Sequence, residues 1–318
     1  MTTSPPTPPR WPSLDSSTLE PTARTLQLWT QIVGKVRLRA TPWVNHAWHA
    51  TLYVSARGLS TSLIHAGDLS FEMEFDLLDQ ALILRDCRGR TERAPLVAGS
   101  IADFYARVRK GLAALDLDIE IHETPNEIAD AVPFSEDTAM RVYDPEAAVA
   151  LWRALTQVDR VFKAFRTRFL GKASPVHLFW GSFDLAVTRF SGREAPPHPG
   201  GVPNLPDTVA REAYSHEVSS AGFWPGGDGM GPSFYAYAYP TPDGFSKAAV
   251  GPAEAAWNAA LGEFLLPYEA VQSAQDPDAA LLEFLQTTYA AAADLAAWDR
   301  VSLECGTGQH GLPRPVKS

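Results

Sequence analysis

SPVHLFWGSFDLAVTRFSGR, residues 174–193, is an apolar stretch that carries a single carboxylate near its middle. Its aromatic and β-branched residues predict a strand, and alternate side chains of a strand lie on the same face. Trp180 and Asp184 would then share one face of the strand, while His177 and Arg189 would share the other. The stretch therefore predicts a core strand with one acidic side chain among apolar neighbours.

Asp184 is the most informative residue of this stretch, because a buried carboxylate must find a partner or shift its pKa upward. One interpretation is a structural ion pair with Arg189 or Arg193, of a kind common in ordinary cores. The other is a carboxylate that binds a ligand or exchanges a proton. Both interpretations remain open from the sequence.

The rest of the second half shows helical and strand-like patterns. Apolar residues at helical spacing predict a helix that begins at Asp144-Pro145 and ends at Gly171. The alternating run FYAYAY at 234–239 predicts a strand. Further helices are predicted over 252–261 and 278–298.

The first half repeats this order. A helical pattern ends at Gly34-Lys35, and PWVNHAWH at 42–49 leads into a strand. Alternation over 71–76 predicts a half-buried strand, and 101–115 predicts a helix. The predicted fold class is therefore α+β, with two similar halves of mainly antiparallel strands packed by helices. A diverged duplication would explain the similarity, and chance recurrence of short motifs is the alternative.

The expected organisation has four parts. Both ends are rich in residues typical of disordered segments, and each half holds enough apolar residues for a core. The parts are a disordered N-terminal tail at 1–20, an N-terminal half at 21–140, a C-terminal half with the candidate site at 141–305, and a disordered tail at 306–318.

Composition excludes several classes of partner. The net charge of -10 gives no attraction for phosphates, so no nucleic-acid partner is expected. No apolar run approaches the roughly 20 residues that span a bilayer, and the N-terminus lacks a signal-peptide core. We therefore expect a soluble, cytoplasmic protein without a membrane partner. Cys87 and Cys305 have no CxxC spacing and do not predict a zinc site.

Several motifs carry a resemblance to a known family. They are VGK at 33–35, NHAWH at 45–49, PNE at 125–127, the stretch at 174–193, YSHEVSSAGFWPG at 214–226 and EFLLPYE at 263–269. From about residue 11 to 304, the chain resembles DUF5996, a family of bacterial proteins known as a domain of unknown function. The resemblance implies a shared fold and carries over no activity.

Four of the eight histidines lie in aromatic-rich stretches, namely His46, His49, His177 and His216. His216-Glu217 invites comparison with the HExxH zinc motif, but residue 220 is serine, so the second ligand is missing. We assign no metal ligands and leave the cofactor open. The alternative is a His-rich metal site formed where the two halves meet, with a carboxylate from Asp184 or Glu217.

We expect a small-molecule site between the two halves, with His/Asp acid–base chemistry on a ligand that carries an anionic group. The predicted catalytic residues are His177, Asp184, His216 and Glu217. The predicted ligand-binding residues are His46, Trp48, His49, Trp180, Arg189, Arg193 and Trp224. Two alternatives are a non-catalytic binding or sensor module, and an interaction protein that oligomerises through the aromatic strand at 234–239. Whether the protein is an enzyme and which oligomer it forms stay open.

Overall fold

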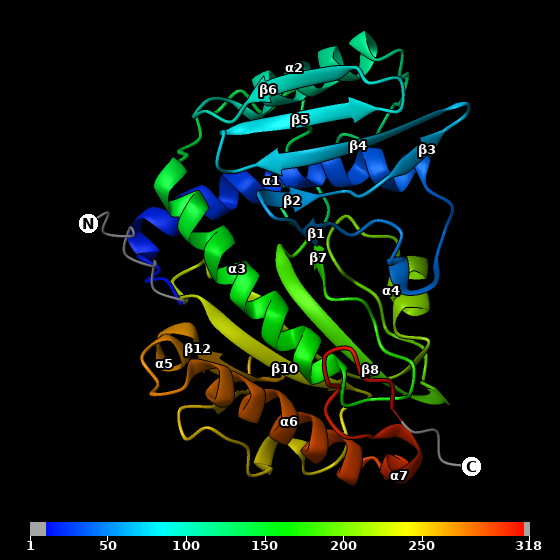
Figure 1. The fold of residues 1–318 in the computed structure, drawn as a ribbon, viewed down its shortest axis with the longest axis vertical. Coiled ribbons are helices and arrows are strands. Elements are labelled where there is room, and N and C mark those ends of the chain that lie inside the picture. The colour runs from blue at the N-terminus through cyan, green and yellow to red at the C-terminus, as the bar shows by residue number, and fades with distance from the viewer. Residues whose placement is uncertain (1–10, 315–318) are drawn as a thin grey trace.

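The computed structural model describes residues 11–314 and contains two antiparallel sheets of six strands each, covered by helices (Figure 1). This confirms the predicted α+β class and its two similar halves. Each half begins with a long helix and continues into its sheet. Among the described residues, no helix combines the length and apolar character that a bilayer crossing requires.

The first sheet has the strand order β1-β2-β4-β5-β6, with β3 paired to β4. Its elements are α1 (Ser16–Ala40), η1 (Asn45–Ala47), β1 (Tyr53–Val54), β2 (Gly58–Ser60), β3 (Ile64–Ala66), β4 (Leu69–Asp76), β5 (Ala81–Asp86), β6 (Thr91–Pro95) and α2 (Ile101–Ala114). The predicted alternation in β4 is confirmed, because Phe71, Met73 and Phe75 are buried. The predicted helix at 101–115 is confirmed as α2.

The second sheet has the strand order β11-β12-β10-β9-β8-β7. Its elements are α3 (Pro145–Arg166), β7 (His177–Phe179), β8 (Asp184–Glu194), α4 (Asp207–Ala213), β9 (His216–Trp224), β10 (Ser233–Tyr239), η2 (Phe245–Lys247), β11 (Ala256–Asn258), β12 (Glu263–Pro267), α5 (Tyr268–Gln272), α6 (Pro277–Leu295) and α7 (Arg300–Leu303). β10 pairs with β9 along its whole length, and its first four residues, 233–236, also pair with β12.

Three local predictions were wrong. The first helix, expected to end at Gly34-Lys35, continues to Ala40. The stretch at 174–193 is a hairpin rather than one strand, because the chain turns between β7 and β8 with Phe183 at a φ of 60°. His177 pairs with Ala186, so His177 and Asp184 lie on the same face of the sheet and Arg189 lies on the opposite face. The predicted helix at 252–261 is instead a turn that leads into β11.

The two faces of the second sheet differ in polarity. One face is apolar and packs against α3 and α6, which cross it in Figure 1. It buries Leu185, Val187, Phe223, Phe234 and Phe264. The register places Asp184, Thr188, Ser220, Tyr235 and Tyr237 on the other face, called the polar face below.

Two segments without helix or strand, residues 117–144 and 195–206, meet over the polar face. The backbone N–H of Glu127 donates to the Pro203 carbonyl at 2.8 Å, and the Asn204 side-chain amide donates to the Ile128 carbonyl at 2.7 Å. One of these segments comes from each half, so the polar face lies at the junction of the two halves.

The halves are also joined through one continuous apolar core. The Trp180 indole N–H donates to the Ala50 carbonyl at 2.7 Å, and the backbones of Leu52 and Leu178 pair. A Cβ atom at Gly34 in α1 would overlap the Trp180 ring, so glycine is required for this contact. Trp180 is therefore a structural link between the halves.

The N-terminal tail is shorter than predicted. Trp11 is buried and donates to an Asp278 carboxylate oxygen at 3.0 Å, and α1 begins at Ser16 with Asp15 as its N-cap. Residues 1–10 and 315–318 lie outside the described residues, so the disorder predicted for them stays a prediction. Within the predicted C-terminal tail, Gly308 donates its N–H to the Thr167 hydroxyl at 3.1 Å.

Candidate functional site

Asp184 is the first residue of β8 and is 6% exposed. The hydroxyls of Ser182 and Tyr235 each donate a hydrogen bond to its carboxylate, one to each oxygen. Burial raises the pKa of the Asp184 carboxyl, and the two donors oppose that rise. The partners that Asp184 needed are hydroxyl groups, whereas the sequence suggested arginines.

Gly222 makes the bond between Tyr235 and Asp184 possible. Tyr235 lies on β10 and Asp184 on β8, with β9 between them. Gly222 of β9 is paired with Tyr235, and a Cβ atom there would overlap the phenol ring. Since glycine has no side chain, the phenol can lie across β9 and reach the next strand.

Glu127 faces Asp184 from the other half of the molecule. Its backbone φ is 63°, and a Cβ atom at Gly181 would overlap its carboxylate. The residue as a whole is exposed, while desolvation of its carboxyl and the negative charge of Asp184 raise the pKa of that carboxyl to about 7.

Glu263, the first residue of β12, adds a third carboxyl group. Desolvation is again the larger cause and the charge of Asp184 the smaller one, and together they raise the pKa of Glu263 to about 7. Two carboxyl groups therefore titrate near neutral pH on either side of a buried carboxylate.

Tyrosine hydroxyls complete the group. Tyr237 and Tyr214 share a hydrogen bond of 2.8 Å between their hydroxyls, and burial raises the pKa of both phenols. Tyr235 and Tyr237 stack with ring centroids 6.0 Å apart. We call these residues the Asp184 cluster; its members are Glu127, Asp184, Tyr214, Tyr235, Tyr237 and Glu263.

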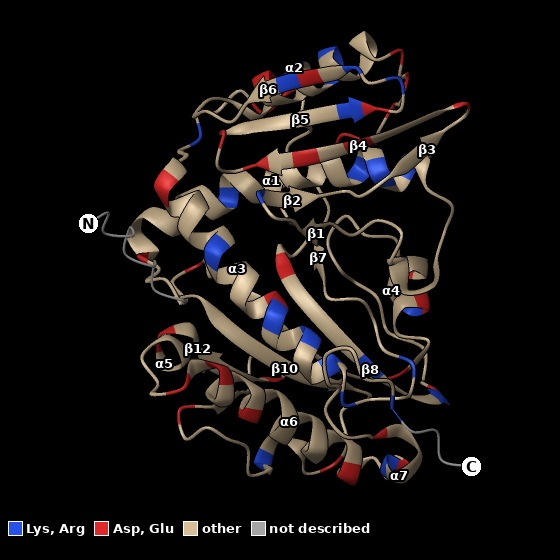
Figure 2. Cartoon of the chain, in the orientation of Figure 1, with Lys and Arg blue, Asp and Glu red and all other residues tan. Residues whose placement is uncertain are grey.

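The Asp184 cluster has no basic partner. None of the ion pairs among residues 11–314 includes Glu127, Asp184 or Glu263. Strands β9, β10 and β12 contain no Lys or Arg, and β10 and β12 are without blue segments in Figure 2. In the part of the chain that the structure describes, no three His, Cys, Asp or Glu side chains converge on a position that could hold a metal ion.

Three of the predicted site residues gather elsewhere on the polar face. The rings of His46 and His216 have centroids 6.2 Å apart, and His46 lies 5.1 Å from Trp48. The Nε2 atom of His46 lies 2.5 Å from the Lys172 amine. The structure thus brings these two histidines together beside a lysine that the sequence did not single out.

His177 and His49 are buried. His177 is fully buried, and neither of its ring nitrogens has a hydrogen-bond partner. Burial, with smaller contributions from the charges of Arg37 and Arg166, lowers the pKa of His177 to about 3. His49 Nδ1 accepts from the Val44 N–H at 3.2 Å. Neither ring contributes to the Asp184 cluster.

Arg189 lies on the apolar face, 1% exposed. Its guanidinium carbon sits 3.5 Å from the centre of the Phe165 ring and 4.3 Å from that of Tyr289. One of its nitrogens donates to the Phe165 carbonyl at 2.5 Å, and burial lowers its pKa to about 10. This guanidinium is enclosed by aromatic rings and does not face Asp184.

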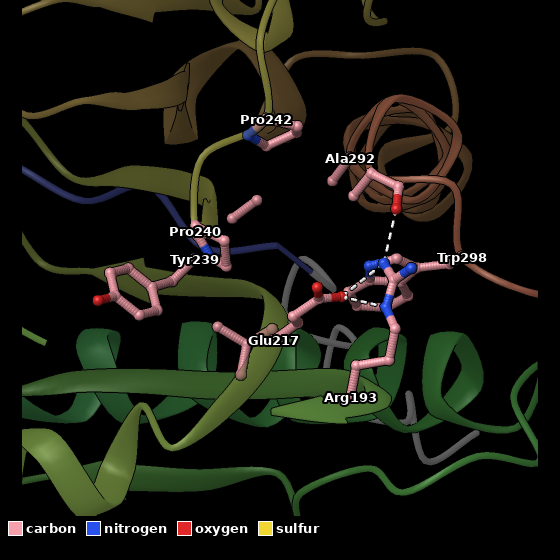
Figure 3. Close-up of a pocket in the computed structure, with 10 residues that line it drawn as sticks. Arg193, Glu217, Tyr239, Pro240, Pro242, Ala292 and Trp298 are labelled. Atoms are coloured by element: carbon pink, nitrogen blue, oxygen red, sulfur yellow. Dashed lines mark hydrogen bonds and ion pairs between the residues drawn. The ribbon is translucent and has the colours of Figure 1, made fainter. Parts of the chain in front are cut away.

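Arg193 and Glu217 bind each other at 2.6 Å beside a pocket of about 240 Å³ (Figure 3). The Arg193 guanidinium also donates to the Ala296 carbonyl at 2.6 Å, at the end of α6. The rest of the pocket is mostly apolar, with Pro240 and Trp298 among its walls. The remaining predicted residue, Trp224, ends β9 and is half-buried.

The predicted site residues therefore separate into several places, and Asp184 alone belongs to the cluster with perturbed carboxyl groups. The other five members of the cluster were not among the predicted residues. A signal was present for each, because Glu127 lies in PNE, Glu263 begins EFLLPYE, Tyr214 begins YSHEVSSAGFWPG, and Tyr235 and Tyr237 lie in the alternating aromatic run.

Fold and site together define a two-sheet α+β protein with a carboxylate–tyrosine cluster at the junction of its halves. The chain belongs to the family of unknown function DUF5996, whose model matches residues 11–305. No curated protein and no solved structure matches the chain.

Proposed function

We propose that the Asp184 cluster is a small-molecule site between the two halves that binds a protonated amine or a similar small organic cation. The main support is the charge of the cluster: it contains three carboxyl groups, and no Lys or Arg in residues 11–314 forms an ion pair with them. A nearby positive charge favours the ionised form of each carboxyl. A cationic ligand would therefore relieve the repulsion among them.

The tyrosines support the same ligand class. Aromatic ring faces attract cations, especially where water is excluded. Tyr235 and Tyr237 place stacked rings between Asp184 and Glu263 on the polar face. An anionic ligand, which we expected from Arg189 and Arg193, has less support because both guanidinium groups have other partners.

Acid–base chemistry at this site is the second part of the proposal. General acid–base catalysis is most efficient when the pKa of the group lies near the working pH. Glu127 and Glu263, each with a pKa of about 7, meet this condition, while Asp184 would orient the cation. Binding without turnover is the alternative, and a ligand recovered chemically unchanged would support it.

Butylamine and butylguanidine are suitable probes, with butyrate and 1-butanol as controls of similar size and different charge. We expect the two cations to raise the melting temperature of the protein and the controls to leave it unchanged. Because Glu127 and Glu263 lose their protons as pH rises through about 7, cation binding should strengthen between pH 6 and pH 8. Titration calorimetry at both pH values measures this.

Asp184→Asn should weaken cation binding about tenfold, equivalent to roughly 1.4 kcal/mol. Asp243→Asn is the matched control, because Asp243 is an exposed loop residue and the change in charge is the same. Equal binding to wild type and Asp184→Asn, or tighter binding of butyrate than of butylamine, would refute the proposal.

A further inference from the structure

Lys172 lies in the loop between α3 and β7. Its amine Nζ is 2.5 Å from Nε2 of His46, which belongs to the other half of the molecule. The residue as a whole is exposed, and among the described residues no carboxylate forms an ion pair with it. Lys172 thus has an imidazole as its polar partner where most surface lysines have water or a carboxylate.

The hydrogen bonds of His46 determine which ring nitrogen faces Lys172. Nδ1 of His46 lies 2.8 Å from the Ala213 carbonyl, which can only accept. Nδ1 therefore carries the ring proton, and Nε2 presents a lone pair to the Lys172 amine. The backbone N–H of His46 donates to a Glu212 carboxylate oxygen at 2.8 Å.

The backbone of His46 is left-handed, with a φ of 59°, and the next residue, Ala47, has a φ of 56°. Histidine is one of the residues other than glycine that adopt this region more often than average. This turn presents the imidazole to Lys172, with Nε2 2.5 Å from the amine.

Two aromatic rings lie beside the amine. The Lys172 Nζ lies 4.8 Å from the centre of the Phe190 ring and 5.4 Å from that of Trp48. Desolvation lowers the pKa of Lys172, and the smaller effect of the Glu212 charge opposes it. A desolvated lysine with a neighbouring base is the arrangement that makes an amine nucleophilic.

We propose that Lys172 is a nucleophilic amine that condenses with an aldehyde, with His46 as the group that accepts and returns the proton. This proposal does not rest on the proposed function of the Asp184 cluster. Asp184 and Phe190, which contacts Lys172, are six positions apart on β8, which corresponds to roughly 20 Å along a strand. The two sites approach each other at the end of α4, where Ala213 contacts His46 and Tyr214 belongs to the Asp184 cluster.

The chemistry balances with the groups present. The Lys172 ammonium first gives one proton to the solvent. The lone pair of the neutral amine then attacks the aldehyde carbon, the C–N bond forms as the carbonyl π bond breaks, and the carbonyl oxygen takes one proton back from the solvent. His46 Nε2 accepts a proton from the nitrogen, which leaves a neutral carbinolamine. The imidazolium then returns this proton to the hydroxyl group, the C–O bond breaks, and water leaves. The product is a protonated imine between Lys172 and the former aldehyde.

Formaldehyde with sodium cyanoborohydride tests this directly, because the hydride reagent reduces each imine as it forms. Peptide mass spectrometry after a limiting exposure at pH 7.5 gives the methylation rate of each lysine. We expect Lys172 to react about tenfold faster than Lys110 and Lys247, which are exposed and serve as internal controls. A Lys172 rate equal to or below theirs would overturn the proposal.

His46→Asn separates the role of the imidazole from that of the backbone. Asparagine tolerates positive φ better than most residues, and its shorter side chain cannot reach Lys172. The Lys172 rate should fall to that of Lys110, while an unchanged far-ultraviolet circular dichroism spectrum verifies the fold. If the variant does not fold, the methylation rate of Lys172 in the wild type is measured as a function of pH. An apparent pKa of Lys172 equal to that of Lys247 in this measurement would contradict the proposal.

Discussion

His177 illustrates the energetic cost of a buried imidazole. It is fully buried without a partner for either ring nitrogen, and its low pKa keeps it neutral at physiological pH. A permanently neutral imidazole cannot donate a proton as an acid. The role that the structure supports for His177 is therefore packing beside Trp48, whose ring centroid lies 6.3 Å away.

This burial gives His177 a predictable effect on acid stability. The unfolded chain protonates this residue near pH 6.5, whereas the folded chain does so only near pH 3. Its contribution to stability is therefore present above pH 6.5 and is lost as pH falls towards 3. The free energy of unfolding of the wild type should fall when the pH is lowered from 7 to 5. In His177→Leu this fall should be smaller by about 2 kcal/mol.

Urea denaturation of both proteins at the two pH values measures this difference. His122→Leu is the matched control, because His122 is exposed and its replacement should leave the pH dependence unchanged. An identical acid response of wild type and His177→Leu would contradict the assignment of a buried, neutral ring.

Asp184 shows how far residue-level prediction could reach. Its apolar neighbours in the sequence were sufficient to predict burial, a raised pKa and the need for a partner. Its actual partner, Tyr235, is 51 positions away. That bond depends on the register of three strands and on a glycine between them, and neither follows from local pattern.

Helix starts with a local cap were predicted better than helix ends and strand boundaries. The start of α3 at Pro145 follows from its Asp144 N-cap, which is a local interaction visible in the sequence. The β7–β8 turn contains Gly181 and Ser182, which are turn formers, but its residue at positive φ is the bulky Phe183. The apolar run on both sides therefore favoured one continuous strand over a hairpin.

The close contact between α1 and Trp180 can be tested by replacing a glycine in each of two helices with alanine. Gly34→Ala should destabilise the protein by about 1–3 kcal/mol, because the new methyl group would overlap a rigid indole. Gly111→Ala in α2 is the matched control. Its nearest neighbour would be a Leu84 methyl at 3.4 Å, so the change should stabilise by about 0.4–1 kcal/mol. Thermal or urea unfolding measures both, and equal effects would contradict the close contact.

The whole molecule should unfold as one unit. A single apolar core spans both halves, and Trp11 at the start of the described chain is hydrogen-bonded to Asp278 near its end. We expect tryptophan fluorescence and far-ultraviolet circular dichroism to report the same urea midpoint. Two separated transitions, or a stably folded fragment of residues 141–305, would show that the halves are independent.

The Trp180 contact also has a kinetic consequence. With the indole seated on Gly34 and bonded to Ala50, the two halves cannot swing apart as domains do around a hinge. If the Asp184 cluster binds a ligand as proposed, we expect the ligand to enter through local opening where Glu127 and Asn204 cross. Those few hydrogen bonds would act as a gate, so the rates at which a ligand enters and leaves would depend on loop motion.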